Sequence, residues 1–212
     1  MSHSLSRRSF AALAAGAVVG SSELLADEKS KAAATDATST TPVVRTPAEA
    51  PFERDYAAPE FQPSWKRPQI NRQLVQDFVI YSHTDADMVK KLLEKEPGLA
   101  VATINWGAGD WESGLGAGAH MGRRDLVEIQ LAHGARMDIF CAAMLGMLEP
   151  IQAFLKFAPK LIDAKGPHGF SLHFHAQVGG KEAEPVLDYL QSVKKIELRP
   201  NPFLQPPTKK PA

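Results

Sequence analysis

The chain has 212 residues, of which 24 are basic and 24 acidic, so its formal net charge at pH 7 is zero with neutral histidines. This balance gives no electrostatic reason to expect binding to nucleic acid or to an anionic membrane surface. The length suits one domain of ordinary size. The single cysteine, Cys141, excludes an intramolecular disulfide, so burial of a core must hold the protein together.

The N-terminus has the features of an export signal. The letters S-R-R-S-F at 6–10 precede an apolar run at 11–19, and no acidic residue occurs before Glu23. This run is about ten residues long, whereas a membrane-spanning helix needs roughly 20. The segment resembles the bacterial twin-arginine (Tat) signal. We therefore predict a signal peptide at 1–26, export to the periplasm and no membrane span in the mature chain; the alternative is an amphipathic N-terminal helix.

Two segments of low complexity flank the middle of the chain. Residues 27–68 are rich in Ala, Thr, Ser, Glu and Pro and are predicted to form a linker, and residues 196–212 form a Pro-rich tail. We expect both flanks to be disordered around a compact region at 69–195, with the alternative that the tail, whose prolines exclude a helix, is extended. Aromatic residues recur near the end of the linker, where they either cap this region or serve as a ligand for a partner protein: Phe52, Tyr56, Phe61 and Trp65.

A short pattern recurs within 69–195: two small residues, two variable ones and a glycine, followed by an apolar helix. It occurs at 118–122, 142–146 and 175–179, and the helices that follow are predicted at 125–135, 149–158 and 185–190. An earlier copy, with its helix at 87–94, has Thr84 in place of the glycine. Small residues let two helices lie close together, and glycine permits a left-handed turn between them. One such pair cannot bury its own apolar face, so we expect the copies to stack.

This pattern resembles the ankyrin repeat, whose consensus is G-x-T-P-L-H-x-A-A-x-x-G-H-x-E-V-V-K-L-L-L-x-x-G-A. The copy at 113–135 matches it in register at these positions: Ser113, Leu115, Gly118, Ala119, Gly122, Asp125, Gly134 and Ala135. The turn positions 84, 122, 146 and 179 are unevenly spaced, whereas the family repeats about every 33 residues. The resemblance implies an all-α fold, a short ankyrin-type solenoid of about four degenerate repeats. It also implies a concave edge that binds a protein or peptide.

Two loops stand out from ordinary connections. One is N-W-G-A-G-D-W-E at 105–112, and the other runs over 165–170. Tryptophan is concentrated at the energetic centres of protein interfaces. We therefore predict a protein-binding edge made of Trp106, Asp110, Trp111, Glu112 and His168. The alternative is that the two tryptophans fold back over the small residues of the following helix.

The histidines permit a second interpretation. His173 occupies the Leu-His position of the repeat, and the resemblance implies that it braces a turn. Imidazole and carboxylate groups from neighbouring repeats would supply nitrogen and oxygen ligands for zinc or another divalent ion. The candidate ligands are His120, His168, His173, His175 and Asp110. No H-E-x-x-H or paired C-x-x-C spacing accompanies them.

The sequence has no G-x-S-x-G elbow, phosphate-binding glycine loop or dinucleotide fingerprint. Cys141 is expected to be a small buried hydrophobe and not a nucleophile. The sequence thus favours an exported ankyrin-repeat protein that binds a protein or peptide, without a cofactor and without catalysis. The alternative is a metal-binding protein or metal-dependent enzyme that uses the histidine and aspartate cluster.

Overall fold

The computed structural model describes residues 49–61 and 63–201, and all of them belong to one compact unit. The predicted signal peptide lies outside the described residues, as do much of the linker and the end of the tail. Within the described residues, no helix is both long and apolar enough to span a membrane.

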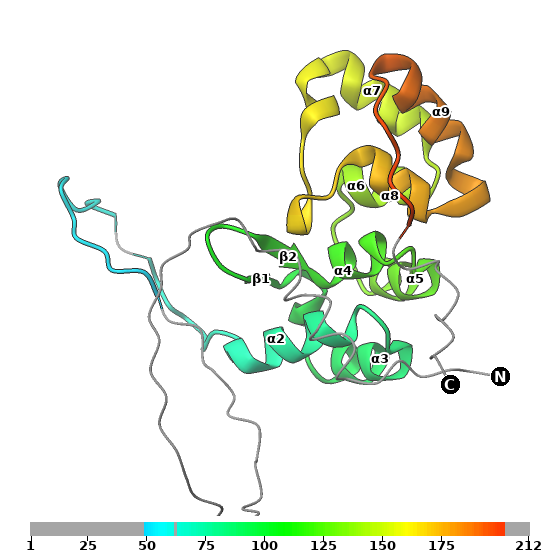
Figure 1. The fold of residues 1–212 in the computed structure, drawn as a ribbon. Coiled ribbons are helices and arrows are strands. Elements are labelled where there is room, and N and C mark those ends of the chain that lie inside the picture. Colours follow the sequence, from blue (N-terminus) through cyan, green and yellow to red (C-terminus); the bar gives the residue numbers. More distant parts are fainter. Residues whose placement is uncertain (1–48, 62, 202–212) are drawn as a thin grey trace, which may run out of the picture. The chain divides into compact units, whose positions relative to one another are not determined.

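The described part is mostly helical, as the resemblance implied (Figure 1). Its α-helices are α2 (Arg72–Tyr81), α3 (Ala86–Lys95), α4 (Gly114–His120), α5 (Arg124–Ala132), α6 (Ile139–Met144), α7 (Leu148–Phe157), α8 (Leu172–Val178) and α9 (Glu184–Val193). Short 3-10 helices are η1 (Pro97–Val101), η2 (Pro159–Asp163), η3 (Pro167–Gly169) and η4 (Gly180–Ala183). The all-α prediction needs one correction, because β1 (Thr103–Asn105) and β2 (Trp111–Ser113) form an antiparallel hairpin.

Consecutive helices pack as pairs: α2 with α3, α4 with α5, α6 with α7, and α8 with α9. The first helices of successive pairs also contact one another, from α2 through α4 and α6 to α8. The helices predicted at 87–94, 125–135, 149–158 and 185–190 correspond to α3, α5, α7 and α9, so these predictions are confirmed.

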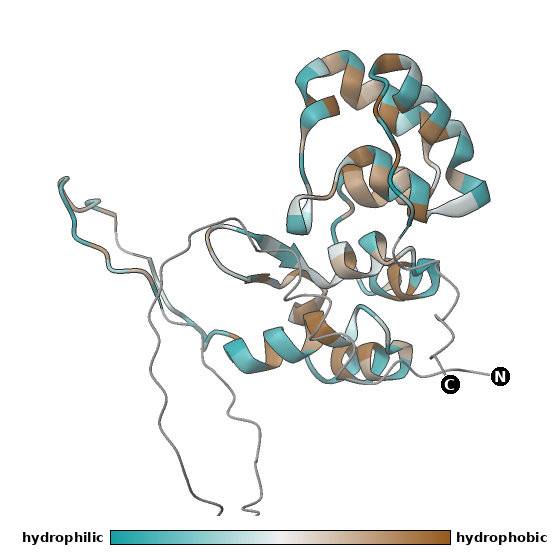
Figure 2. Ribbon diagram, viewed as in Figure 1, coloured by the Kyte–Doolittle hydropathy of each residue, from teal (hydrophilic) through white to brown (hydrophobic). Residues whose placement is uncertain are grey.

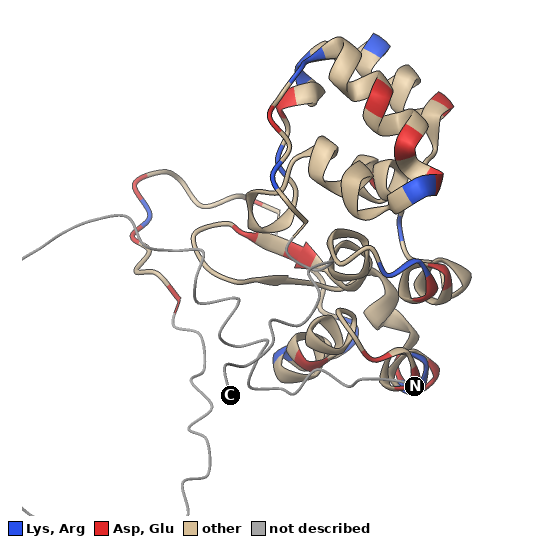
Figure 3. Ribbon diagram, turned by 45° about the vertical axis from the view of Figure 1, so that its right-hand side comes forward, with Lys and Arg blue, Asp and Glu red and all other residues tan. Residues whose placement is uncertain are grey.

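Each helix turns an apolar stripe towards its neighbours. In α3, for example, Val89, Leu92 and Leu93 are buried at the spacing of one helix face. Figure 2 shows hydrophobic and hydrophilic residues mixed along the individual helices. Basic and acidic residues are intermixed over the helices and are not gathered by sign (Figure 3), in line with the zero net charge.

The turn glycines explain part of the repeated pattern. Gly122 and Gly146 have φ values of 66° and 78°, the left-handed conformation that the pattern predicted. In the last copy the prediction was displaced by one residue, since Gly179 has φ −67° and Gly180 has φ +67°. Gly179 is required for another reason: a Cβ there would lie 2.1 Å from the carbonyl oxygen of Met144.

These turns predict a large difference between two glycine substitutions. Gly134→Ala is expected to cost about 1 kcal/mol, because Gly134 has φ 88° but open space around it. Gly146→Ala is expected to cost about 3 kcal/mol or more, since the added Cβ would also lie 2.2 Å from the carbonyl oxygen of Glu182. Equilibrium urea unfolding of the two variants measures the difference. Equal losses of stability would contradict the role of the close approach between Gly146 and the carbonyl oxygen of Glu182.

The aromatic residues of the linker do not cap the helices. Phe52, Tyr56, Phe61 and Trp65 are 56–82% exposed, so the capping interpretation is wrong. The beginning of the tail, in contrast, is fixed to the helices. The side chain of Gln191 bonds to both backbone groups of Ile196, and residues 196–201 are non-helical, as predicted, and are held to α9.

Candidate metal centre

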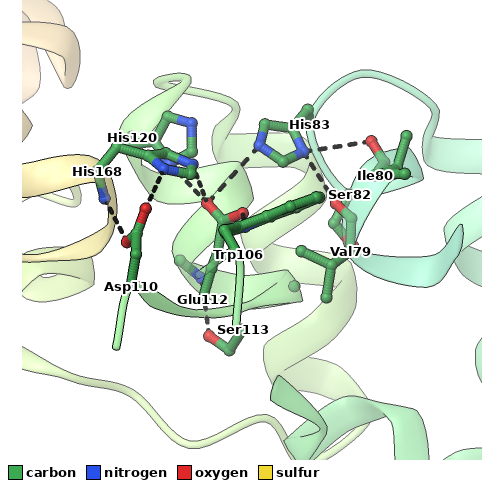
Figure 4. A network of polar contacts seen from close by, with 12 residues as sticks. Val79, Ile80, Ser82, His83, Trp106, Asp110, Glu112, Ser113, His120 and His168 are labelled. Carbon is green, nitrogen blue, oxygen red and sulfur yellow. Dashed lines mark hydrogen bonds and ion pairs between the residues drawn. The ribbon is translucent and has the colours of Figure 1, made fainter. Parts of the chain in front are cut away.

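Four side chains that commonly bind metals converge at one point: His83, Glu112, His120 and His168 (Figure 4). Each offers one ligand atom, and these four atoms all lie within 4.8 Å of one another. His83 lies in the turn after α2, Glu112 in the middle of β2, His120 at the end of α4, and His168 in the middle of η3. The cluster therefore joins segments that are far apart in the sequence.

The geometry of the cluster is centred on one carboxylate oxygen, Oε1 of Glu112. It lies 3.1 Å from Nδ1 of His120, 3.4 Å from Nε2 of His168 and 3.6 Å from Nε2 of His83. Among the described residues, Oε1 accepts no hydrogen bond of ordinary geometry. Ligands placed tetrahedrally about 2.0–2.1 Å from a zinc ion are about 3.3 Å from each other. The three distances from Oε1 to the nitrogens are compatible with this value, and no two of the four ligand atoms are more than 4.8 Å apart.

Two of the imidazoles are oriented by hydrogen bonds on their far side. Nδ1 of His83 donates to the carbonyl oxygen of Val79 at 2.9 Å, which leaves the lone pair on Nε2, the nitrogen that faces Glu112. Nδ1 of His168 donates to Oδ2 of Asp110 at 2.8 Å, and its Nε2 is the nitrogen that faces Glu112. Histidines that bind metals almost always have such a partner on the other nitrogen.

The carboxylate of Glu112 is oriented in the same way. Its second oxygen, Oε2, accepts a hydrogen bond of 2.7 Å from Nε1 of Trp106. The side chain of Glu112 is fully buried, and those of His83 and His120 are 2% and 3% exposed. His168, at 28% exposed, is the ligand that reaches solvent.

The hairpin places Glu112 by simple alternation along β2. Trp111 is exposed, whereas Glu112 next to it is buried and pairs with Ile104 of β1. The connecting loop turns sharply at 107–109, where three successive residues have positive φ. Oδ1 of Asn105 closes this turn by accepting bonds from two backbone N–H groups of the loop. Asp110 follows directly and is thereby held beside the cluster.

The loop at 166–169 presents His168 in an unusual conformation. His168 has φ 57°, which is uncommon for a residue other than glycine. Asp110 holds it twice, since Oδ1 accepts the backbone N–H of His168 at 2.8 Å while Oδ2 holds the ring. Gly116 lets this loop approach α4, because a Cβ on Gly116 would lie 3.3 Å from Cγ of Pro167.

The charges in the cluster balance one another. Burial alone would raise the pKa of Glu112, but the neighbouring imidazoles of His120 and His168 hold it well below its usual range. Burial lowers the pKa of His83 to about 4 despite the nearby carboxylate. The contact with Glu112, together with Asp110, raises the pKa of His168 to about 9. Without a metal, a protonated His168 thus neutralises the buried carboxylate, and an ion bound there would take the place of that proton.

The structure brings together only part of the predicted metal set. His120 and His168 belong to the cluster, and Asp110 lies behind His168 as its hydrogen-bond partner. His173 and His175 lie elsewhere: Nε2 of His173 is 2.9 Å from the carbonyl oxygen of Lys194, and Nδ1 of His175 is 2.9 Å from that of Ser171. Two residues take their places in the cluster, Glu112 and His83. Sequence reasoning assigned Glu112 to protein binding and did not single out His83.

The predicted protein-binding edge also divides into two parts. Glu112 is fully buried and cannot contact a partner, while Trp106, Asp110 and His168 hydrogen-bond within or beside the candidate cluster. Trp111 is 60% exposed, on the opposite face of β2 from Glu112. It does not fold back over the following helix. Trp111 therefore exposes a large side chain on the face away from Glu112, while Trp106 beside the cluster is 38% exposed.

Cys141 behaves as the sequence predicted. Its side chain is fully buried in α6, and burial raises the pKa of its thiol to about 12. A thiol in this state is not a nucleophile at neutral pH.

The burial of His175 is expected to make the stability of the folded protein sensitive to acid. Burial lowers its pKa from 6.5 to about 4, so the unfolded chain binds a proton there before the folded protein does. Stability from this residue is therefore lost as the pH falls from about 6.5 to 4, by about 3 kcal/mol in all, and the loss levels off below pH 4. His175→Asn retains a donor for Ser171 without titrating. Urea unfolding of both metal-free proteins across this range should show the steeper loss in the unsubstituted chain, and parallel curves would contradict the assignment.

Comparison with known protein families, curated proteins and solved structures finds no match to this chain.

Proposed function

We propose that this protein binds one divalent transition-metal ion through His83, Glu112, His120 and His168, and that zinc is the ion its donors fit best. The observation that carries the proposal is the buried oxygen Oε1 of Glu112 with three imidazole nitrogens 3.1–3.6 Å away. Three nitrogens and one carboxylate oxygen suit zinc, whereas magnesium and calcium prefer sets made of oxygen.

Four protein ligands favour a closed site over a catalytic one. Catalytic zinc sites usually have three protein ligands and keep a position for water, while structural sites fill all four positions with side chains. Here three of the four ligands are buried, so little room is left for a substrate. The ligands also come from separate segments of the chain, and a bound ion would tie η3 and the hairpin to α2 and α4. We therefore favour a stabilising role for the ion over metal-dependent catalysis.

The finer assignments of fold and location are part of the same proposal. The paired helices and left-handed glycine turns support an ankyrin-type repeat stack of degenerate copies. The sequence at 6–26 supports export through the twin-arginine route to the periplasm. That route carries folded proteins, which suits a protein that takes up its metal before export.

Binding of a protein or peptide is a second candidate function, favoured by Trp111. This side chain is 60% exposed on the face of the hairpin that points away from Glu112. Exposed tryptophans are enriched at interface hot spots. Trp111→Ala should then abolish capture of a partner and leave the thermal midpoint nearly unchanged. A variant that instead unfolds would assign Trp111 a structural role.

Isothermal titration of metal-free protein with zinc tests the main proposal. We expect one zinc per chain, and we expect His83→Ala to weaken binding by more than about 100-fold, beyond what loss of an outer hydrogen-bond partner costs. His133→Ala is a matched control. Nδ1 of His133 contacts the carbonyl oxygen of Ile129 at 2.8 Å, four residues earlier, just as Nδ1 of His83 contacts Val79 at 2.9 Å.

His133 lies outside the cluster, so His133→Ala should bind zinc like the unsubstituted protein. Absence of zinc binding in the unsubstituted protein would overturn the proposal. Equal weakening by the two variants would show that zinc binds at a different place.

A further inference from the structure

We infer that Trp106 determines how many ligands the metal receives, and so which metal the site prefers; this inference rests on the proposed metal binding. Nε1 of Trp106 donates to Oε2 of Glu112 at 2.7 Å, and Oε1 of the same carboxylate faces the three imidazoles. The indole N–H can only donate, so it acts on the carboxylate and cannot itself bind the ion.

A carboxylate can bind a metal through one oxygen or through both. In this site Oε2 already accepts a short hydrogen bond to a charged group, which is stronger than one between neutral groups. Binding through both oxygens would break that bond inside a buried environment. Glu112 is thereby restricted to Oε1, and the protein supplies four donors in total. Zinc accepts four ligands, whereas manganese favours six.

The indole is well placed to impose this restriction. The backbone N–H of Trp106 bonds to the carbonyl oxygen of Asp110 at 2.9 Å, which fixes the residue across the hairpin loop. The same hairpin carries Glu112, so the ligand and its hydrogen-bond partner are held by one element. The ring lies 6.2 Å from that of His168, between centroids, and is 38% exposed. Figure 4 shows Trp106 and the imidazoles around Glu112.

Trp106→Phe isolates the effect of the indole N–H, because it keeps an aromatic ring and removes the donor. Oε2 is then free to join Oε1 on the ion, which raises the coordination number. Trp111→Phe is the matched control: it is the same substitution, in the same hairpin, on the opposite face. The full chain is used in both cases, loaded with cobalt(II) in place of zinc.

Visible absorption of cobalt(II) distinguishes the geometries, since four-coordinate cobalt absorbs much more strongly than five- or six-coordinate cobalt. We expect strong absorption in the unsubstituted protein and in Trp111→Phe, and several-fold weaker absorption in Trp106→Phe. In competition experiments, the preference for zinc over manganese should fall roughly 10-fold or more in Trp106→Phe alone. Losing a side chain that hydrogen-bonds to a metal ligand usually has an effect of this size.

The outcomes separate this inference from the proposed function. If all three proteins bind cobalt with the same spectrum and keep the same preference for zinc over manganese, metal binding stands and the role of Trp106 is wrong. If Trp106→Phe binds no cobalt at all, Trp106 assembles the site and does not select the metal, which also overturns the inference. If the unsubstituted protein binds no metal, the proposed function and the inference fail together.

Discussion

Zinc at a free concentration about 100 times its dissociation constant is expected to raise the free energy of unfolding by about 2.7 kcal/mol. The reason is that His83, Glu112, His120 and His168 come from four separate segments and meet only in the folded protein. A domain of this size should then gain about 10 °C in its thermal midpoint. Thermal unfolding in zinc buffers, compared with unfolding in excess chelator, measures the shift.

Two controls accompany this measurement. Magnesium at the same concentration should leave the midpoint unchanged, because it prefers oxygen ligands and the cluster offers three nitrogens. His83→Ala should lose most of the response to zinc. Equal midpoints of the unsubstituted protein in zinc and in chelator would contradict the prediction.

Glu112→Gln is expected to weaken zinc binding by more than about 100-fold. Loss of a side chain that only hydrogen-bonds to a ligand costs up to about 100-fold, and loss of a ligand should cost more. Glutamine keeps the size of the side chain and removes its charge. The amide oxygen would accept the bond from Nε1 of Trp106, which turns the amide NH₂ towards the three imidazoles. An NH₂ group donates hydrogen bonds and cannot replace Oε1 as a ligand.

Competition with a chromophoric chelator measures this loss of affinity. Glu128→Gln is a suitable control, since Glu128 is an exposed carboxylate on α5, and it should bind zinc normally. The metal-free Glu112→Gln variant should remain folded, because the amide NH₂ can donate to the lone pair on Nε2 of His83. Zinc affinity within a few-fold of that of the unsubstituted protein would show that Glu112 is not a ligand.

The helices could be predicted from the sequence because their signals are local. Apolar spacing in α3, α5, α7 and α9 reflects the face that each helix buries, and the left-handed turns at Gly122 and Gly146 require residues without a Cβ. The displaced turn at Gly180 has a physical reason as well. Two consecutive glycines occur there, and Gly179 is needed for close approach to Met144 while Gly180 takes the left-handed conformation.

The candidate metal cluster could be predicted only in part, because its four side chains share no spacing in the sequence. His83, Glu112 and His168 lie in a turn, a strand and a 3-10 helix, and only the packed fold brings them to His120. His173 and His175 lie on α8, with their rings beside the carbonyl oxygens of Lys194 and Ser171, and the fold does not bring them into the group of four.

Alternation along the hairpin was the signal that sequence reasoning left unused. Successive residues of a strand point to opposite faces, so Trp111 and Glu112 could not both belong to one binding edge. The buried member, Glu112, is the carboxylate at the centre of the cluster, and the exposed member, Trp111, lies on the free face.

X-ray absorption at the zinc edge, measured on the zinc-loaded full chain, tests the central claim most directly. The proposed site predicts three imidazole nitrogens and one carboxylate oxygen at about 2.0–2.1 Å from the ion. A zinc environment with fewer than three imidazoles, or a chain that retains no zinc, would contradict it.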